Sequence, residues 1–260
     1  MSQTLQSVAQ ALRVIQLLQN HADLGVTEVA SRLGIGVSTA HRLLATLLEF
    51  HFVEQLDAGR RYRLGPAMSS SGDAAAIEHC IEVGFPIMQH LRDESTETVH
   101  ISVLNGQQTR FVSVIESPRV MRVTSRVGVS IPSHTAASGK ILLAQLSDDE
   151  LDALYPDEEL PGGTGRGLHT LTELKRELAQ TRERGYARNL GESEEGLAAI
   201  AVPIHRPSGR PVACLTLTGP LSRFNPDATA DATAEPSARE LEFLRMLTEH
   251  AAQIEQALSF

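Results

Sequence analysis

The chain has 260 residues, a formal net charge of −9 and 42% hydrophobic residues. With this composition a disordered chain is not the default expectation, and the length allows one or two domains with substantial cores. Because the sequence holds no apolar run of membrane-spanning length and no signal-peptide pattern at its start, we expect a cytoplasmic protein with no membrane partner.

The first predicted element is a helix over residues 7–18. Its apolar residues recur at helical spacing, and the face they form can close the core of a small domain. The residues concerned are Val8, Ala11, Leu12, Ile15 and Leu18.

A helix-turn-helix pattern follows over residues 26–50. Thr27 is a candidate N-cap for a short helix, and Gly34 lies where the chain must turn sharply. The second helix is predicted from about Ser38 to Phe50, with an apolar face formed by Ala40, Leu43, Leu44, Leu47 and Leu48. That face leaves polar residues exposed at the amino-terminal end, where such a helix contacts bases and phosphates. They are Ser38, Thr39, His41 and Arg42.

A β-hairpin is predicted directly after this helix. Two strands flank a turn at 57–59, and the second strand carries Arg60, Arg61 and Arg63. Such a hairpin suits binding to the phosphate backbone, and residues 26–64 therefore match a winged helix-turn-helix. The helices alone could also be a glycine-containing corner in a protein core, but the arginines and the helix over 7–18 favour a DNA-binding domain.

Charge is divided unevenly along the chain. Residues 1–66 carry six arginines and five acidic residues, a net charge of +1, so the remainder carries −10. We therefore expect modest non-specific DNA affinity and a need for dimerisation to strengthen binding. The acidic remainder should be repelled by DNA and is expected to have another role.

A linker and a second domain are predicted beyond residue 66. Residues 66–72 are expected to break regular structure, and a connecting helix is expected over Asp73–Val83. From Phe85 onward the pattern is α+β, with antiparallel strands and helices on one side. Expected strands cover 99–104, 109–116, 120–125, 199–204 and 211–218, and expected helices cover 86–95 and 238–258.

Two further helices are predicted by capping boxes, Ser147 with Glu150 and Thr170 with Glu173. The low-complexity stretch 227–237 is expected to be a loop, as is the turn at 207–209. The predicted domains are 1–66 for DNA binding, 67–84 as a linker helix, and 85–260 as a sensor domain.

Several patterns that suggest catalysis lack the context that catalysis needs. Ser138-Gly139-Lys140 lacks the glycine spacing of a phosphate-binding loop, and the glycine-rich residues 162–167 follow no strand of a dinucleotide-binding unit. The histidines form no metal-binding pair, and no nucleophile elbow is present. We expect no catalytic residue, no metal and no cofactor.

A cluster suited to a small acid remains. Residues 131–140 run from an extended segment into a helix of small residues, whose first amides can bind a carboxylate. Thr216 and Thr218 face the same side of a strand, and Asn189 could add a polar contact. Apolar walls are expected from Val120, Val123, Ile131 and Leu197. The alternative is that the threonines are ordinary strand residues and the helix is simply tightly packed.

The chain resembles the IclR family of bacterial one-component transcriptional regulators over essentially its whole length. The matching stretches are Ser38–Leu47, Tyr62–Gly65, Glu97–His100, Ser125–Gly128, His134–Lys140, Arg182–Tyr186 and Gly219–Arg223. The resemblance implies a winged-helix domain, a linker helix used in dimerisation and a GAF-like effector-binding sheet. It also implies double-stranded operator DNA, a metabolite and a second copy of the chain as partners.

Carried over by position, the family's ligand site falls on Ala137, Ser138, Asn189, Ala199, Thr216 and Thr218. Members that sense glyoxylate or pyruvate carry Asp at position 189, Cys at 199, and Ser at 216 and 218. The Asn removes a negative charge and supplies donors, the Ala opens space, and the added methyl groups make the wall more apolar. These departures favour a larger acid, an aromatic one included. Gly36 and Val37 replace a proline or serine and a basic residue frequent in the family, which shifts phosphate contacts toward the hairpin.

Two other functions are compatible with parts of this sequence. A DNA-binding repressor that needs no ligand would share the amino-terminal half. An enzyme acting on a small carboxylate would need a nucleophile–base pair or metal near the pocket, and no such constellation converges there.

Overall fold

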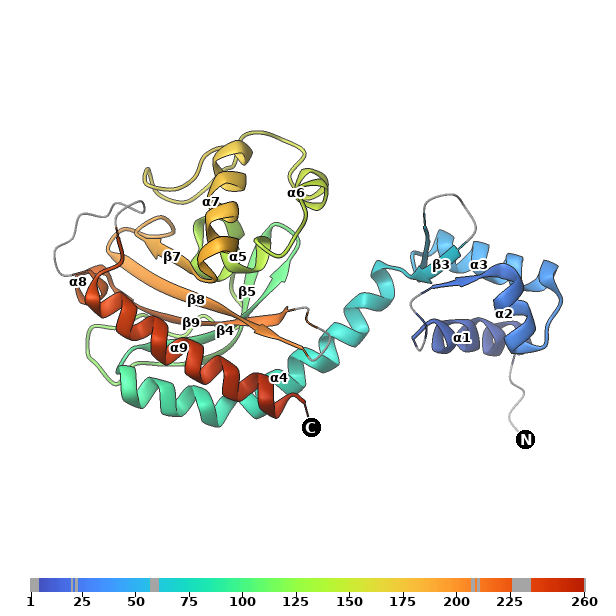
Figure 1. Cartoon of the computed structure of the whole chain (residues 1–260), viewed down its shortest axis with the longest axis horizontal. Coiled ribbons are helices and arrows are strands. Elements are labelled where there is room, and N and C mark those ends of the chain that lie inside the picture. The colour runs from blue at the N-terminus through green and yellow to red at the C-terminus, as the bar shows by residue number, and fades with distance from the viewer. Residues whose placement is uncertain are drawn as a thin grey trace. The chain divides into compact units, whose positions relative to one another are not determined.

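The computed structural model describes residues 5–19, 21, 23–56, 61–206, 209, 211–225 and 235–259. The chain divides into two compact units, Met1–Ala76 and Ile77–Phe260 (Figure 1). Across the described residues, none of the helices combines the length and apolar character needed to cross a bilayer.

The smaller unit is a three-helix core with a small antiparallel sheet. Its elements are α1 (Gln6–Gln19), β1 (Leu24–Gly25), α2 (Val26–Leu33), α3 (Val37–Glu49), β2 (Val53–Gln55) and β3 (Arg61–Leu64). The strands lie in the order β1-β3-β2. Gly34 ends α2 in the left-handed region with φ 64°, which only a residue without a Cβ adopts at no cost. The predicted helix-turn-helix and hairpin are therefore confirmed as elements of the fold.

Two details of this unit differ from expectation. Thr27 is not the N-cap, because α2 begins at Val26 after Gly25, whose backbone N–H donates to the Glu28 carboxylate at 2.7 Å. Val8 and Leu12 are about half exposed, whereas Val14 is fully buried beside Ile15. The core-facing side of α1 is thus rotated from the predicted face, since apolar residues occupy more than one side of this helix.

One continuous helix, α4 (Pro66–Ser95), replaces the predicted break at 66–72 and the two predicted helices after it. Pro66 is the first helical residue. At this position a backbone N–H would have no acceptor within the helix, so proline, which lacks one, is tolerated there. Gly72 lies inside the helix at a cost of about 1 kcal/mol relative to Ala. Neither residue therefore stopped the helix.

A six-stranded antiparallel sheet forms the larger unit, in the order β6-β5-β4-β9-β8-β7. Its strands are β4 (Thr98–Asn105), β5 (Gln108–Ile115), β6 (Ser130–Pro132), β7 (Ala187–Leu190), β8 (Leu197–His205) and β9 (Pro211–Pro220). Its helices besides α4 are η1 (Ser133–Thr135), α5 (Ala137–Leu143), α6 (Asp148–Leu154), α7 (Leu171–Arg184), α8 (Leu221–Phe224) and α9 (Ala238–Ala257). The predicted capping boxes at Ser147 and Thr170 start α6 and α7.

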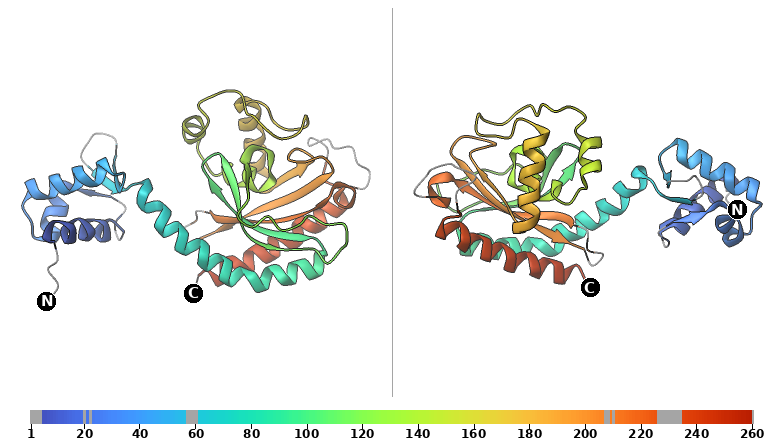
Figure 2. Two further views of the ribbon diagram at one scale, coloured as in Figure 1. Left: turned by 180° about the vertical axis from the view of Figure 1, so that it is seen from behind. Right: turned by 45° about the horizontal axis from the view of Figure 1, so that its top comes forward.

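Helices cover both faces of this sheet (Figure 2), so the expectation of helices on one side is wrong. α9 lies with α4 on one face, and α5 and α7 lie on the other (Figure 2). Gly84 of α4 lies close to both Ile101 of β4 and Ile254 of α9. That face is therefore the aliphatic core, because odd-numbered residues of β4 and β9 point into it.

The predicted strand over 120–125 is absent; the segment is irregular, and β6 pairs with β5 instead. Side-chain hydrogen bonds replace the strand ladder there. The Glu116 carboxylate accepts from the Ser125 backbone N–H at 2.8 Å, and the Thr98 hydroxyl donates to the Val123 carbonyl at 2.8 Å. The predicted turns at 57–59 and 207–209 and the loop at 227–237 lie partly or wholly outside the described residues.

Candidate functional site

A hollow opens on the second face of the larger sheet, beside the first turn of α5. It encloses about 380 Å³ counting its open mouth. All predicted ligand residues except Val120 line it: Val123, Ile131, Ala137, Ser138, Asn189, Leu197, Ala199, Thr216 and Thr218. Val120 is 98% exposed and lies away from the lining, so its predicted place in an apolar wall is wrong.

Strand alternation gives the hollow a floor of polar and small side chains. His100 of β4 lies opposite Thr216 of β9, and Thr218 lies opposite Ala199 of β8. Ala199 in turn lies opposite Asn189 of β7. Because alternate residues of a strand share a face, these five side chains lie on the face opposite the aliphatic core.

The first turn of α5 forms a second wall of the hollow. Its N-cap, Ala136, has no side chain that can accept a hydrogen bond. The first amides of a helix have no intrahelical acceptor, so those of Ala137 and Ser138 can donate elsewhere. A Cβ on Gly139 would lie 2.1 Å from the Ser133 carbonyl oxygen. Only glycine lets this helix lie so close to the preceding turn.

The Asn189 side chain does not offer donors to the hollow as predicted. Its amide nitrogen donates to the Thr135 carbonyl at 3.1 Å and to the Ser193 hydroxyl at 2.6 Å. Its oxygen accepts from the backbone N–H groups of Gly191 and Glu192, both at 3.0 Å. Both donors and both acceptor positions are engaged within the chain. Asn189 therefore fixes the shape of the hollow by joining the 191–193 turn to the segment before α5.

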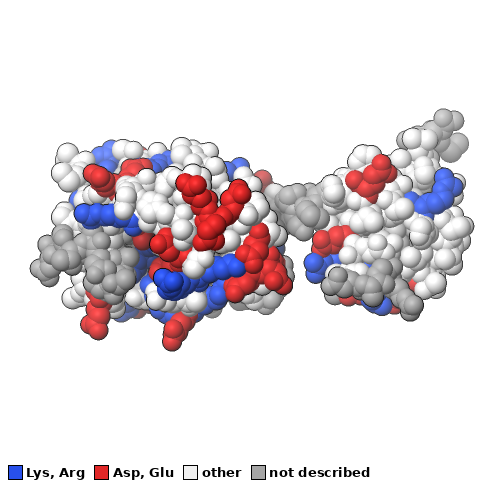
Figure 3. Space-filling view, turned by 90° about the horizontal axis from the view of Figure 1, so that it is seen from above, with Lys and Arg blue, Asp and Glu red and all other residues white. Residues whose placement is uncertain are grey.

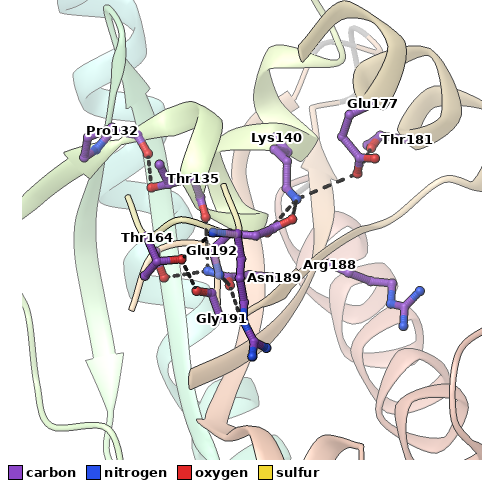
Figure 4. A network of polar contacts seen from close by, with 12 residues as sticks. Pro132, Thr135, Lys140, Thr164, Glu177, Thr181, Arg188, Asn189, Gly191 and Glu192 are labelled. Atoms are coloured by element: carbon purple, nitrogen blue, oxygen red, sulfur yellow. Dashed lines mark hydrogen bonds and ion pairs between the residues drawn. The ribbon is translucent and has the colours of Figure 1, made fainter. Parts of the chain in front are cut away.

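A buried ion pair holds α5 from its other side (Figure 4). The Lys140 ammonium donates to both carboxylate oxygens of Glu192 at 2.9 and 2.8 Å, and the lysine side chain is 1% exposed. Glu177 of α7 approaches the same ammonium at 3.8 Å and also pairs with Arg184. Burial raises the pKa of Glu192 and the nearby lysine charge opposes that rise. This pair was not predicted, because its partners are 52 positions apart and no local pattern connects them.

Of the described residues that line the hollow, Arg126 alone carries a formal charge. It comes from the segment between β5 and β6, and its guanidinium donates to both carboxylate oxygens of Glu194 at 2.6 and 2.9 Å. That hydrogen-bonded pairing raises the pKa of Arg126 and lowers the pKa of Glu194. Glu194 is half exposed, so its replacement by another carboxylate would cost little.

Five lining residues were not predicted as ligand residues: His100, Phe111, Arg126, Ala136 and Ser193. One signal could have identified His100. Thr98, His100 and Ser102 alternate with three aliphatic residues on β4, and a polar face on a central strand indicates a pocket. Arg126 lies in an irregular segment that carries no such periodicity. Within the described ranges, no group of His, Cys, Asp and Glu residues is arranged to hold a metal ion.

The polar end of α3 is exposed on the smaller unit, as predicted. Ser38, Thr39, His41 and Arg42 are all exposed, while Ala40 and Leu44 on the opposite side are fully buried. Thr39 and Arg42 also line a surface groove whose other side is α1. Thr27 is exposed on α2. These side chains are therefore available to an external partner.

The described arginines of the hairpin are exposed but paired with acidic groups. Arg61 pairs with Asp23 and Glu28, and Arg63 pairs with Glu54 on the neighbouring strand. Exposed ion pairs of this kind contribute about 0–1 kcal/mol to stability. A phosphate can therefore take the place of the acidic partner of either arginine. Arg60 lies outside the described residues.

The two units differ in their charge. Acidic side chains, with basic ones among them, lie on the visible face of the larger unit, and the smaller unit shows fewer charges, of both signs (Figure 3). This agrees with the net charge of +1 for residues 1–66 against −10 for the remainder. A polyanion would meet least repulsion at the smaller unit.

Comparison with known proteins gives matches over both units. The family model described as "IclR helix-turn-helix domain" matches residues 7–57. The family model described as "Bacterial transcriptional regulator IclR C-terminal" matches residues 74–240. The HTH-type transcriptional regulator XynR of Escherichia coli (strain K12) is 32% identical over 229 residues, 85% of this chain and 88% of XynR.

Solved structures share the fold. The crystal structure of the Thermotoga maritima IclR covers 98% of this chain and 99% of its own, with a TM-score of 0.61 and 25% identity. An IclR homolog from Microbacterium hydrocarbonoxydans, crystallised with 4-hydroxybenzoate, matches with a TM-score of 0.59 at 22% identity. It covers 97% of this chain and 98% of its own.

Proposed function

The chain belongs to the IclR family of bacterial transcriptional regulators, and on this premise we propose that it binds operator DNA as a dimer or a dimer of dimers under the control of a small organic acid. Members of this family are regulators with a DNA-binding and an effector-binding domain, and they are not enzymes. The proposed division of labour is DNA binding by residues 1–66, coupling by 67–84 and sensing by 85–260. The cytoplasm, where the DNA lies, is the proposed location.

The exposed end of α3 is the proposed base-reading surface. Ser38, Thr39, His41 and Arg42 offer hydroxyl, imidazole and guanidinium groups of the kinds that contact base edges and phosphates. Thr27, Arg60, Arg61 and Arg63 are proposed to contact the backbone. For the described hairpin arginines, each phosphate contact replaces an acidic partner within the chain. Non-specific affinity should therefore be modest, and two linked domains would strengthen it.

The positive charge of Arg126 is the observation that carries the choice of an acid. It is the one formal charge among the described lining residues, and the first amides of α5 add donors in the same hollow. A carboxylate would be attracted by both. A cationic effector would meet no opposite charge among these lining residues.

The size of the effector is inferred from the walls. Ala199 is small, and Thr216 and Thr218 line the hollow together with Phe111, Leu197 and Ile131. This mixture favours an acid with an apolar body over a two- or three-carbon keto acid. The 4-hydroxybenzoate in the Microbacterium hydrocarbonoxydans homolog is an acid of this type, although at 22% identity that protein is evidence for the shared fold alone.

Coupling requires that the acid bind one arrangement of the dimer better than another. We place the difference in α4, whose residues 73–83 form the proposed linker, so that the spacing of two winged helices on DNA changes on binding. Coupling free energies between two binding sites of one protein are typically about 1–3 kcal/mol.

Loss of the Arg42 side chain should weaken operator binding. The operator is first selected with the full-length protein from a random duplex pool, and affinity is then measured by fluorescence anisotropy over a range of salt concentrations. Arg42→Ala should lose about 1–3 kcal/mol of binding free energy if Arg42 contacts a base, with acid binding unchanged. Arg42 is exposed, so the fold should be unaffected.

Arg245→Ala is the matched control, because Arg245 is also exposed but lies on α9 of the larger unit. It should bind the operator with wild-type affinity. If Arg42→Ala also bound at full strength, the proposed register of α3 on DNA would be wrong. If the pool yielded no preferred sequence, operator binding itself would be contradicted.

A further inference from the structure

His100 lies in the wall of the hollow, and one of its two ring nitrogens, Nδ1, is buried there without a partner among the described residues. The residue is 1% exposed and lines the hollow from the central strand β4. Among the described residues, none is a hydrogen-bond partner for its Nδ1 atom. A buried polar atom without a partner costs about 1–3 kcal/mol, so such atoms are uncommon in folded proteins.

The surroundings of the ring do not supply that partner. Its centroid lies 5.0 Å from that of Phe111, and Thr216 lies opposite on β9. The Thr216 hydroxyl lies 3.9 Å from the Cys214 sulfur. Burial, and then the charge of Arg126, lowers the pKa of His100 to about 3, so the ring is neutral at physiological pH. One ring nitrogen of a neutral histidine donates and the other accepts.

We propose that the effector carries a hydroxyl group in addition to its carboxylate, and that this hydroxyl forms a hydrogen bond with His100. The inference rests on the proposed function, because it assumes an acid in this hollow. A hydroxyl both donates and accepts, so it satisfies Nδ1 in either tautomer, whereas a carbonyl satisfies only a protonated Nδ1. A second charged group would face an uncharged, buried ring and is disfavoured. The effector is thus a hydroxy acid, with Arg126 and the α5 amides at its carboxylate.

A purely structural histidine is the competing explanation. Its neighbours Val99 and Ile101 point into the aliphatic core, and His100 points away from them toward the hollow. A packing role would make the size of the ring important and its nitrogen atoms irrelevant. The two explanations therefore differ in whether the protein distinguishes acids that differ by one hydroxyl.

The experiment compares matched acids on the full-length protein by isothermal titration. The pairs are 4-hydroxybenzoate with benzoate, and lactate with propionate. Within the pair that binds, the wild type should prefer the hydroxylated acid by about tenfold or more. His100→Phe keeps an aromatic ring but removes both nitrogens, and it should bring that ratio close to one. His100→Asn places an amide near the position of Nδ1 and should retain part of the preference.

Each outcome decides the inference. Equal affinity of the wild type for both members of a pair would overturn it and leave acid control intact. A preference that survives in His100→Phe would overturn it as well. The wild-type ratio needs no variant, so the inference remains testable if His100→Phe does not fold. Binding of none of the four acids would contradict the proposed acid effector, while operator selection would still test DNA binding separately.

Discussion

Lys140→Met should lower the free energy of unfolding of the larger unit by about 3–5 kcal/mol. Methionine fills similar space but leaves the Glu192 carboxylate buried without the cation that it contacts at 2.8 Å. Glu177 lies 3.8 Å from the same ammonium, so the change removes the charge between two carboxylates. Urea unfolding followed by circular dichroism measures the loss.

A second substitution shows whether the unpaired charge is the cause. Lys140→Met combined with Glu192→Met should recover most of the lost stability, because replacing both members of a buried pair is often neutral. Lys175→Met is the surface control, since Lys175 pairs with Asp152 at 2.6 Å, and the two side chains are 29% and 55% exposed. It should change stability by less than about 1 kcal/mol. Equal effects of Lys140→Met and Lys175→Met would contradict the role given to the buried pair.

Gly139→Ala should destabilise the larger unit and abolish its response to the effector. The added methyl group would lie 2.1 Å from the Ser133 carbonyl oxygen and 2.4 Å from the Ser133 Cα, so backbone must move. Overpacking of this kind costs about 1–3 kcal/mol and sometimes more. The shift displaces the first turn of α5, whose amides are proposed to bind the carboxylate. Thermal unfolding and acid titration measure the two effects.

Gly165→Ala provides the control for this substitution. A Cβ at Gly165 has no described atom within 4 Å and the residue has no positive φ. The free energy of unfolding of Gly165→Ala should stay within about 0.5 kcal/mol of the wild-type value. Wild-type stability and effector response in Gly139→Ala would mean that α5 and the Ser133 turn are not packed as described.

Local patterns made much of the fold predictable. The capping boxes at Ser147 and Thr170 were correct because a cap depends on residues three positions apart. The prediction of a turn at Gly34 was also correct, because it depends on the conformation of a single residue. Composition misled at 66–72, where serine and glycine suggested a break although α4 continues through them. The strand β7 is only four residues long and was missed.

The polar contacts of the site were less predictable than its lining. Strand alternation placed Thr216 and Thr218 on one face without further information. The engagement of Asn189 depends on Thr135, which lies 54 positions away, and Arg126 meets Glu194 across 68 positions. No periodicity connects such distant residues. We therefore predicted that Asn189 binds the ligand, whereas its hydrogen bonds are to other residues of the chain.

Binding of an organic acid in the hollow of the larger unit is tested most directly by thermal shift. The purified full-length protein is heated with keto acids, benzoates and hydroxy acids, alongside Thr216→Val as the altered pocket. A true effector at a hundredfold its dissociation constant adds about 2.7 kcal/mol to stability, which raises the melting temperature. We expect a selective rise in melting temperature with one of the larger acids, and a much smaller rise in Thr216→Val. A flat response to every acid, or an equal rise in Thr216→Val, would contradict it.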